Sequence, residues 1–202
     1  PAVTIDRYAV VGNPVSHSLS PKIHQQFAAQ TQQSIGYEAI ELPLDDFAAQ
    51  VAKLQLQGMK GLNVTVPFKQ QAWGICDQRS THAETAGAVN TIVFRNDNHI
   101  VGDNTDGTGL IRDLVENHQI AIRSCKILIL GAGGAVRGVL EPLIALQPES
   151  ITIANRTPDK ARQLARVFHQ KAEIKTCGYE DLGESKYDLI INATAAGLNN
   201  QV

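Results

Sequence analysis

A lysine stands at the end of the sequence NVTVPFK, residues 63–69, directly after a strand-like pattern. The alternation of side chains predicts a strand over residues 61–66, with its valines facing the core and Asn63 and Thr65 facing the opposite side. The proline lacks a backbone N–H and ends the strand, so Lys69 opens the next segment. Lys69 is either an ordinary solvated charge or a group that transfers a proton, and its spacing alone leaves both interpretations open.

Serines gather in the loop GNPVSHSLSP, residues 12–21, which follows the first predicted strand. Ser20, directly before Pro21, has the pattern of a helix N-cap followed by a proline in the first turn. The alternative is that hydroxyls and free backbone amides at this helix start bind a carboxylate. Ser18 has no capping role that the pattern assigns, so it is a candidate for binding.

Two aspartates, Asp103 and Asp106, lie in the sequence GDNTDG between a predicted strand and a predicted helix. Asp106 either caps a helix that starts at Gly107 or provides a carboxylate for acid–base chemistry. Asn90 lies in the otherwise apolar strand pattern GAVNTIVF. A buried amide needs hydrogen-bond partners, so Asn90 is either satisfied by the fold or directed into a cleft.

A glycine-rich turn joins an apolar strand to a helix in the sequence KILILGAGGAVRG, residues 126–138. Gly131 permits the tight turn, and Gly133 lets the backbone approach a pyrophosphate at the start of the helix. The third glycine position of the dinucleotide fingerprint is Val136. A plain turn is the alternative, but the strand and helix on either side favour a dinucleotide site.

The next predicted strand ends in Asn155-Arg156-Thr157, where NAD-binding proteins usually carry a carboxylate for the ribose. A carboxylate would repel a 2′-phosphate, whereas the guanidinium of Arg156 and the ammonium of Lys160 would bind one, so NADP is preferred over NAD. The alternative is that Arg156 is solvated and that Thr157 only caps a helix starting at Pro158.

Strand-like and helical patterns alternate along the whole chain, which predicts an α/β fold. The first half has about five expected strands, and the second half continues with the rhythm of a Rossmann-type, doubly wound parallel sheet. We therefore expect an N-terminal α/β domain over residues 1–104 and a Rossmann-type domain over residues 105–202. The predicted strands are 7–12, 37–42, 61–66, 88–95, 99–104, 126–130, 150–155, 173–177 and 188–194, and the predicted helices include 21–30, 44–57, a helical region over 69–86, and 158–169.

Composition limits the class of partner. A formal net charge of −2 and a pI near 6.3 provide no basic patch for nucleic acid or an acidic membrane surface. No apolar run approaches the roughly 20 residues that span a bilayer, and the start has no signal-peptide pattern. The 3 cysteines (Cys76, Cys125 and Cys177) are odd in number, and the 6 histidines lack zinc-ligand spacing. We expect a cytoplasmic protein with a small-molecule substrate and no metal.

The motifs GNPVSHSLSP, NVTVPFK, GAVNT, GDNTDG, GAGGA, NRT and NATAAG occur in this order, from Tyr8 to Leu198. Together they resemble the shikimate dehydrogenase family of aromatic amino-acid biosynthesis. The resemblance implies an NADP-dependent oxidoreductase that reversibly reduces 3-dehydroshikimate to shikimate. It permits a monomer or a homodimer, and it implies a Rossmann domain that is truncated at its C-terminus, because the family pattern continues past residue 202.

The resemblance also implies a role for each matching residue. Ser18 and Ser20 would bind the substrate carboxylate, and Lys69 with Asp106 would be catalytic. The groups around the ring hydroxyls would be Asn63, Thr65, Asn90 and Asp106, with Lys69 beside them. The cofactor would contact Gly131, Gly133, Gly134 and Ala135 at its pyrophosphate, Asn155, Arg156, Thr157 and Lys160 at its 2′-phosphate, and the loop from Asn192 to Leu198, including Thr194.

Three alternatives remain open at this point. A related quinate/shikimate dehydrogenase would share most motifs, and one sequence does not reveal the substrate range. Another two-domain dehydrogenase, such as a methylenetetrahydrofolate dehydrogenase, would leave the serine-rich loop unexplained. A truncated, non-catalytic dinucleotide-binding fragment would keep the glycine loop without turnover.

Overall fold

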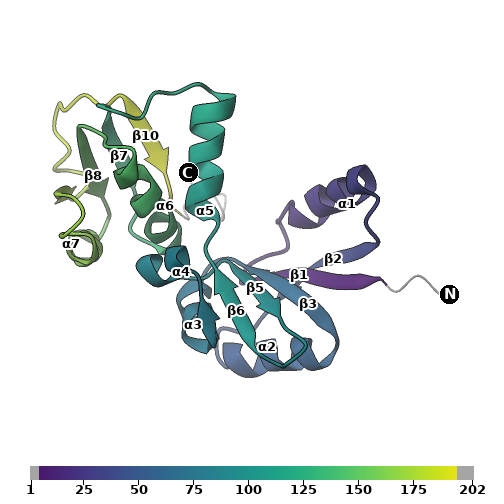
Figure 1. Cartoon of the computed structure of the whole chain (residues 1–202). Helices are drawn as coiled ribbons and strands as arrows, with labels where there is room; N and C mark the ends of the chain where they lie inside the picture. Colours follow the sequence, from purple (N-terminus) through teal and green to yellow (C-terminus); the bar gives the residue numbers. More distant parts are fainter. Residues whose placement is uncertain (1–4, 195–202) are drawn as a thin grey trace. The chain divides into compact units, whose positions relative to one another are not determined.

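The computed structural model describes residues 5–194 and divides the chain into two units, Pro1–Thr105 and Asp106–Val202 (Figure 1). Each unit is built around its own β-sheet. Among residues 5–194, no helix has the length and apolar character needed to cross a bilayer.

Unit 1 alternates strands and helices, as its sequence predicts. Its elements are β1 (Asp6–Gly12), α1 (Ser20–Thr31), β2 (Ile35–Glu41), α2 (Phe47–Leu56), β3 (Met59–Val64), α3 (Lys69–Ile75), β4 (Gln78–Arg79), α4 (Thr81–Ala86), β5 (Thr91–Phe94) and β6 (Ile100–Asp103).

The sheet of unit 1 has six strands in the order β2-β1-β3-β5-β6-β4. β1, β2 and β3 are parallel to one another, β5 runs antiparallel between β3 and β6, and β4 is parallel to β6. The ends of β1, β3 and β6 therefore lie at the same edge as the start of β5. The register places Asn63 opposite Thr91 and Thr91 opposite Asp103 along this edge.

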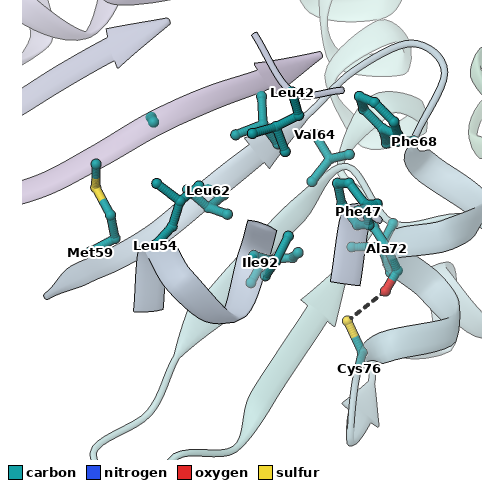
Figure 2. Close-up of a cluster of buried hydrophobic side chains, with 14 of the residues drawn as sticks. Leu42, Phe47, Leu54, Met59, Leu62, Val64, Phe68, Ala72, Cys76 and Ile92 are labelled. Carbon is teal, nitrogen blue, oxygen red and sulfur yellow. Dashed lines mark hydrogen bonds between the residues drawn. The ribbon is translucent and has the colours of Figure 1, made fainter. Parts of the chain in front are cut away.

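The core of unit 1 covers one face of this sheet (Figure 2). Alternate strand residues pack against α2 and α3, where the rings of Phe47 and Phe68 stack with centroids 4.9 Å apart. α1 lies on the opposite side of the sheet from α2 (Figure 1) and buries none of its residues. The two faces are thus packed to very different degrees.

Unit 2 contains a parallel sheet in the order β10-β7-β8-β9. Apolar residues of the strands and helices fill its core, and Leu140, Leu143, Ile129 and Ile153 are fully buried. The α/β fold with a Rossmann-like second sheet, predicted from the sequence, is confirmed. Its elements are α5 (Asp106–Arg112), the π-helical turn η1 (Asp113–Asn117), β7 (Lys126–Leu130), α6 (Gly134–Ala145), β8 (Ser150–Ala154), α7 (Pro158–Val167), β9 (Ile174–Cys177) and β10 (Leu189–Asn192).

Several predicted boundaries were wrong. β3 ends at Val64, two residues early, and Val66 is 41% exposed instead of facing the core. Val66 precedes a cis proline, and its carbonyl accepts a hydrogen bond from the Asn13 amide, so this segment pairs with the loop after β1 and leaves the sheet. The helical region predicted over 69–86 is two helices, α3 and α4, separated by the short strand β4.

Candidate functional site

Polar side chains collect at the edge of the unit 1 sheet where β1, β3 and β6 end and β5 begins. The loop after β1 carries Ser18, the loop after β3 carries Thr65, and the residue before β5 is Asn90. Carboxyl ends of parallel strands are where α/β sheets bind ligands. A substrate site in unit 1 is therefore expected at this edge.

A row of hydrogen bonds links a side chain of β2 to the side chains at this edge. The Tyr37 hydroxyl donates to Asn63 Oδ1 at 2.6 Å, and Asn63 Nδ2 donates to Thr91 Oγ1 at 3.4 Å. The Thr91 hydroxyl donates to Asn90 Oδ1 at 2.9 Å, and Asn90 Nδ2 donates to Thr105 Oγ1 at 3.0 Å. Two of these five residues, Asn63 and Asn90, are predicted substrate-binding residues.

Asn90 is the most buried member of the row, with 9% of its surface exposed. It lies just before β5, so the prediction that it lies within the strand was wrong. Its backbone carbonyl accepts from the Val64 amide at 2.7 Å, its backbone amide donates to the Asp103 carbonyl at 3.0 Å, and its Oδ1 also accepts from the Thr105 amide at 3.0 Å. The fold thus supplies partners for this buried amide, and its side chain still lies at the edge of the sheet.

The serine loop leads directly into α1. The helix starts at Ser20 itself, and the N-cap position is Leu19, so the interpretation of Ser20 as the N-cap was wrong. The Ser18 hydroxyl accepts a hydrogen bond from the Ser20 amide at 3.2 Å, which gives Ser18 the role of satisfying a backbone group in this turn. The side chain of Ser20 lies beside the hydroxyl of Tyr37.

Lys69 is the first residue of α3 and is half-buried. The ring of Phe68, directly before it, is fully buried in the core, and the Lys69 carbonyl accepts from the Val89 amide at 2.8 Å. The Thr65 amide donates to the Val11 carbonyl at 2.9 Å, and the Thr65 carbonyl accepts from the Phe68 amide at 3.0 Å. The backbone from Thr65 to Lys69 is thus fixed on both sides.

The two aspartates of GDNTDG have different surroundings. Asp103 accepts hydrogen bonds from the Ser80 hydroxyl and, at 2.7 Å, from the Asn104 amide, so its carboxylate has a structural role at the start of α4. Asp106 is the first residue of α5, which therefore does not start at Gly107, and it belongs to unit 2. Its pairing with Lys69 stays a prediction.

The glycine loop of unit 2 has the shape that a dinucleotide needs. Gly131 has φ +108°, and a Cβ there would lie 2.9 Å from the carbonyl oxygen of Ala193. Gly133 is the N-cap of the 12-residue helix α6, and a Cβ built on it meets no atom of the described residues within 4 Å. The amides at the start of α6 are thus open to an anion. Gly134 and Ala135 form the first turn of α6, while Val136, the third fingerprint position, is fully buried in the core.

Two cations follow the second strand of unit 2. Arg156 and Lys160 are exposed, and within residues 5–194 neither makes an ion pair. Asn155 Nδ2 donates to the Thr157 carbonyl at 2.8 Å, which orders the turn that carries Arg156. Thr157 is the N-cap residue of α7, but its side chain makes no capping hydrogen bond. This turn fits a 2′-phosphate, because both charges are available at a helix start.

The end of β10 lies beside the glycine loop. Register pairs Asn192 with Leu130, and the Ala193 amide donates to the Leu130 carbonyl at 2.9 Å. Asn192 Oδ1 accepts from the Thr194 amide at 3.1 Å and from its hydroxyl at 2.8 Å. β8 continues the sheet on one side of β7 and β10 on the other, which is the switch point where such sheets bind nucleotides. The remainder of this predicted loop, residues 195–198, lies outside the described residues.

One pKa in the unit 1 site is strongly shifted. Burial raises the pKa of Tyr37 from 10.0 to about 12, and the hydrogen bond with Ser20 acts weakly in the opposite direction. The phenol therefore stays neutral at physiological pH. Within residues 5–194, no group of three or more histidine, cysteine, aspartate or glutamate side chains could hold a metal ion.

Sequence reasoning missed three members of the hydrogen-bonded row: Tyr37, Thr91 and Thr105. Tyr37 belongs to a strand with no site-like motif, and only the pairing of β2 with β1 and of β1 with β3 brings it near Asn63. Thr91 and Thr105 lie next to predicted residues, so their proximity in the sequence was a usable signal.

Comparison with known proteins finds one family model that matches within each unit. Residues 10–92 match the family model described as the shikimate dehydrogenase substrate binding domain, and residues 113–199 match the model described as shikimate / quinate 5-dehydrogenase. The shikimate dehydrogenase (NADP(+)) of Marinobacter nauticus is 50% identical over 99% of this chain and 74% of its own length. That of Hahella chejuensis is 53% identical over 98% of this chain and 73% of its own length.

Solved structures give the same result. The shikimate 5-dehydrogenase of Thermus thermophilus, solved in complex with NADP(H) and shikimate, superposes with a TM-score of 0.81 at 33% identity. The match covers 94% of this chain and 69% of that one. The chain belongs to the shikimate dehydrogenase family, as its sequence motifs predict.

Proposed function

We propose that this protein catalyses the reversible, NADPH-dependent reduction of 3-dehydroshikimate to shikimate. The observation that carries the proposal is the row of hydrogen-bonded polar side chains that runs from Tyr37 within the unit 1 sheet to Thr105 at its edge. Family membership and the names of the relatives support the reaction and the cofactor.

The substrate is assigned to the edge of the unit 1 sheet. Ser18 and Ser20 bind the carboxylate through their hydroxyls at the start of α1, where helix amides add positive potential. Asn63, Thr65 and Asn90 hydrogen-bond the ring hydroxyls and fix the orientation of the ring. Precise orientation matters because a ring that is misaligned with the catalytic groups reacts much more slowly.

Lys69 and Asp106 hold and move the proton at the oxygen on ring carbon C3. In the direction of reduction, the ammonium of Lys69 stabilises negative charge on this oxygen, and the carboxylate of Asp106 orients the ammonium. Whether Lys69 or Asp106 passes the proton directly is left open by the proposal. NADPH, when bound, supplies the hydride.

NADP is assigned to unit 2. Gly131, Gly133, Gly134 and Ala135 leave room for its pyrophosphate at the start of α6, and Arg156 with Lys160 binds its 2′-phosphate. Asn155 and Thr157 order the turn beneath that phosphate. Asn192 and Thr194 border the same site at the end of β10.

The replacement Lys69→Ala tests the proposal. We expect turnover of shikimate, followed by the absorbance of NADPH, to fall by about 10²- to 10⁴-fold with little change in substrate binding. Lys60→Ala is the matched control, because Lys60 is an exposed lysine on β3 that is not assigned to the site. Near-wild-type turnover by Lys69→Ala would rule out its catalytic role.

The same assay separates the alternatives. Comparing the turnover of shikimate with that of quinate tests the quinate/shikimate alternative. The description of the second family model names both compounds. Mass spectrometry of the assayed protein fixes its length, and NADP+ binding without turnover would favour the non-catalytic fragment. We further infer a cytoplasmic enzyme, which three unpaired thiols support, and predict a monomer or homodimer, to be measured by light scattering.

A further inference from the structure

The hydroxyl of Tyr37 lies between two side chains that are assigned to the substrate. It donates to Asn63 Oδ1 at 2.6 Å, and it lies beside the side chain of Ser20. Ser20 comes from the start of α1 and Asn63 from β3, so two different elements meet at one phenol. Tyr37 itself lies in the middle of β2, back from the edge of the sheet.

The ring of Tyr37 is clamped by a histidine. The rings of His24 and Tyr37 stack with centroids 3.9 Å apart and an interplanar angle of 9°. His24 Nδ1 lies 2.9 Å from the Ser20 carbonyl oxygen, and because a carbonyl only accepts, Nδ1 carries the hydrogen. His24 therefore connects the first turn of α1 to the tyrosine, because it hydrogen-bonds to Ser20 and stacks on the ring of Tyr37.

The direction of the Tyr37–Asn63 hydrogen bond fixes the orientation of the Asn63 amide. In the structure the phenol donates to the amide oxygen, and the amide nitrogen therefore faces Thr91 at 3.4 Å. Among the described residues, Asn63 Nδ2 makes only this hydrogen bond. Because an amide nitrogen has two hydrogens, one remains for a ring hydroxyl of the substrate.

We propose that Tyr37 is a positioning residue of the substrate site, which sets the orientation of the Asn63 amide and the Ser20 hydroxyl without touching the substrate. This inference rests on the proposed function, because it assigns Asn63 and Ser20 to substrate binding. It predicts that the Tyr37 hydroxyl contributes to shikimate affinity and not to NADP+ affinity.

The chain provides a matched control for the Tyr37 hydroxyl. Tyr8 on β1 is the register partner of Tyr37, and both residues line the same groove, with a volume of about 460 Å³, between the sheet and α1. Among the described residues, no hydrogen bond from the Tyr8 hydroxyl is found. Tyr8→Phe thus removes a hydroxyl from the same groove, with the same change in size, but without breaking the row.

Steady-state kinetics of Tyr37→Phe and Tyr8→Phe test the inference. For Tyr37→Phe we expect the shikimate KM to rise about tenfold, with the NADP+ KM unchanged and kcat reduced less than about threefold, because ground-state orientation of the ring is what the hydroxyl supports. Tyr8→Phe should retain both KM values. A purely structural role would lower the melting temperature of Tyr37→Phe and leave its shikimate KM unchanged, which would overturn the inference.

A double replacement tests whether Tyr37 acts through Asn63. In Asn63→Ala the amide is gone, so adding Tyr37→Phe should raise the shikimate KM by much less than it does in the wild-type background. Fully additive effects would overturn this route. Wild-type protein that neither binds nor oxidises shikimate would overturn the proposed function and the inference together, whereas active wild type with Tyr37→Phe equal to Tyr8→Phe would overturn the inference alone.

Discussion

The glycines of the nucleotide loop in unit 2 allow folding and cofactor binding to be tested separately. Gly131 and Gly133 are two residues apart, but the structure has no room for a side chain at Gly131 and has room for one at Gly133. We consider the replacements Gly131→Ala and Gly133→Ala, each of which adds one methyl group. Only the first should destabilise the protein, and both should weaken NADP+ binding.

The cost at Gly131 has two parts. Its φ of +108° is a conformation that alanine avoids, at about 1–3 kcal/mol. The new Cβ would also lie 2.9 Å from the backbone oxygen of Ala193 and 3.1 Å from its carbonyl carbon, so the end of β10 must move, at about 1–3 kcal/mol. We therefore expect the free energy of unfolding to fall by about 2–6 kcal/mol.

At Gly133 neither cost applies. Its φ of −95° and ψ of −167° are accessible to alanine, and no atom of the described residues lies within 4 Å of the new Cβ. Alanine also restricts the unfolded chain, which stabilises by up to about 1 kcal/mol. The methyl group nevertheless stands at the start of α6, in the space assigned to the pyrophosphate, so the Kd for NADP+ should rise at least about tenfold.

Urea unfolding followed by circular dichroism measures the first quantity, and titration calorimetry with NADP+ measures the second. The expected result is an earlier unfolding midpoint for Gly131→Ala only, and a higher Kd for both variants. An unchanged midpoint for Gly131→Ala would refute the strain argument. A wild-type Kd for Gly133→Ala would refute the assignment of the pyrophosphate to the start of α6.

Three further predictions concern single side chains. Arg156→Asp should lower the preference for NADP over NAD, measured as the ratio of kcat/KM values, by about tenfold or more through repulsion of the 2′-phosphate; an unchanged ratio would contradict the assignment. Burial raises the pKa of the Cys76 thiol to about 11, so a thiol reagent at pH 8 should label the other two cysteines of the folded protein and Cys76 only after denaturation, as peptide mapping would reveal. The pKa of Tyr37 is raised from 10.0 to about 12, so the folded state keeps this proton to a higher pH than the unfolded state does. The contribution of the protonated phenol to the free energy of unfolding is therefore lost as the pH rises from 10.0 to about 12. The free energy of unfolding should therefore fall more steeply with pH in this window for the wild type than for Tyr37→Phe, and parallel curves would contradict this.

The strand, turn and helix of the proposed nucleotide site were predictable from the sequence because their signals are local. The apolar run of β7, the turn at Gly131 and the start of α6 follow one another within a few residues, and the structure has them in that order. The turn with Arg156 likewise follows β8 directly and precedes α7. In both places, residues next to each other in the sequence form the feature.

The polar edge of the unit 1 sheet, where the substrate is proposed to bind, was predictable only in part. Tyr37 and Asn63 are 26 residues apart and meet through the pairing of three strands, which no local pattern reveals. Asn90 reaches the edge because β5 is antiparallel, so the residue before the strand takes the place that a residue after a parallel strand would have. The predicted position of Val66 was wrong for a related reason, since its partner is the loop at Asn13 and not a neighbouring strand.

The absence of buried residues in α1 has a consequence for how tightly the substrate binds. Local opening of a helix requires less free energy when little apolar surface is exposed by it, so amide hydrogens of α1 should exchange with solvent faster than those of α2, which buries Phe47, Val51 and Leu54. Ser20 stands at the start of this weakly protected helix. On the proposed assignment of Ser20 to the substrate carboxylate, binding would restrict the motion of α1, and the entropy lost in doing so would be subtracted from the affinity that the hydrogen bonds otherwise give.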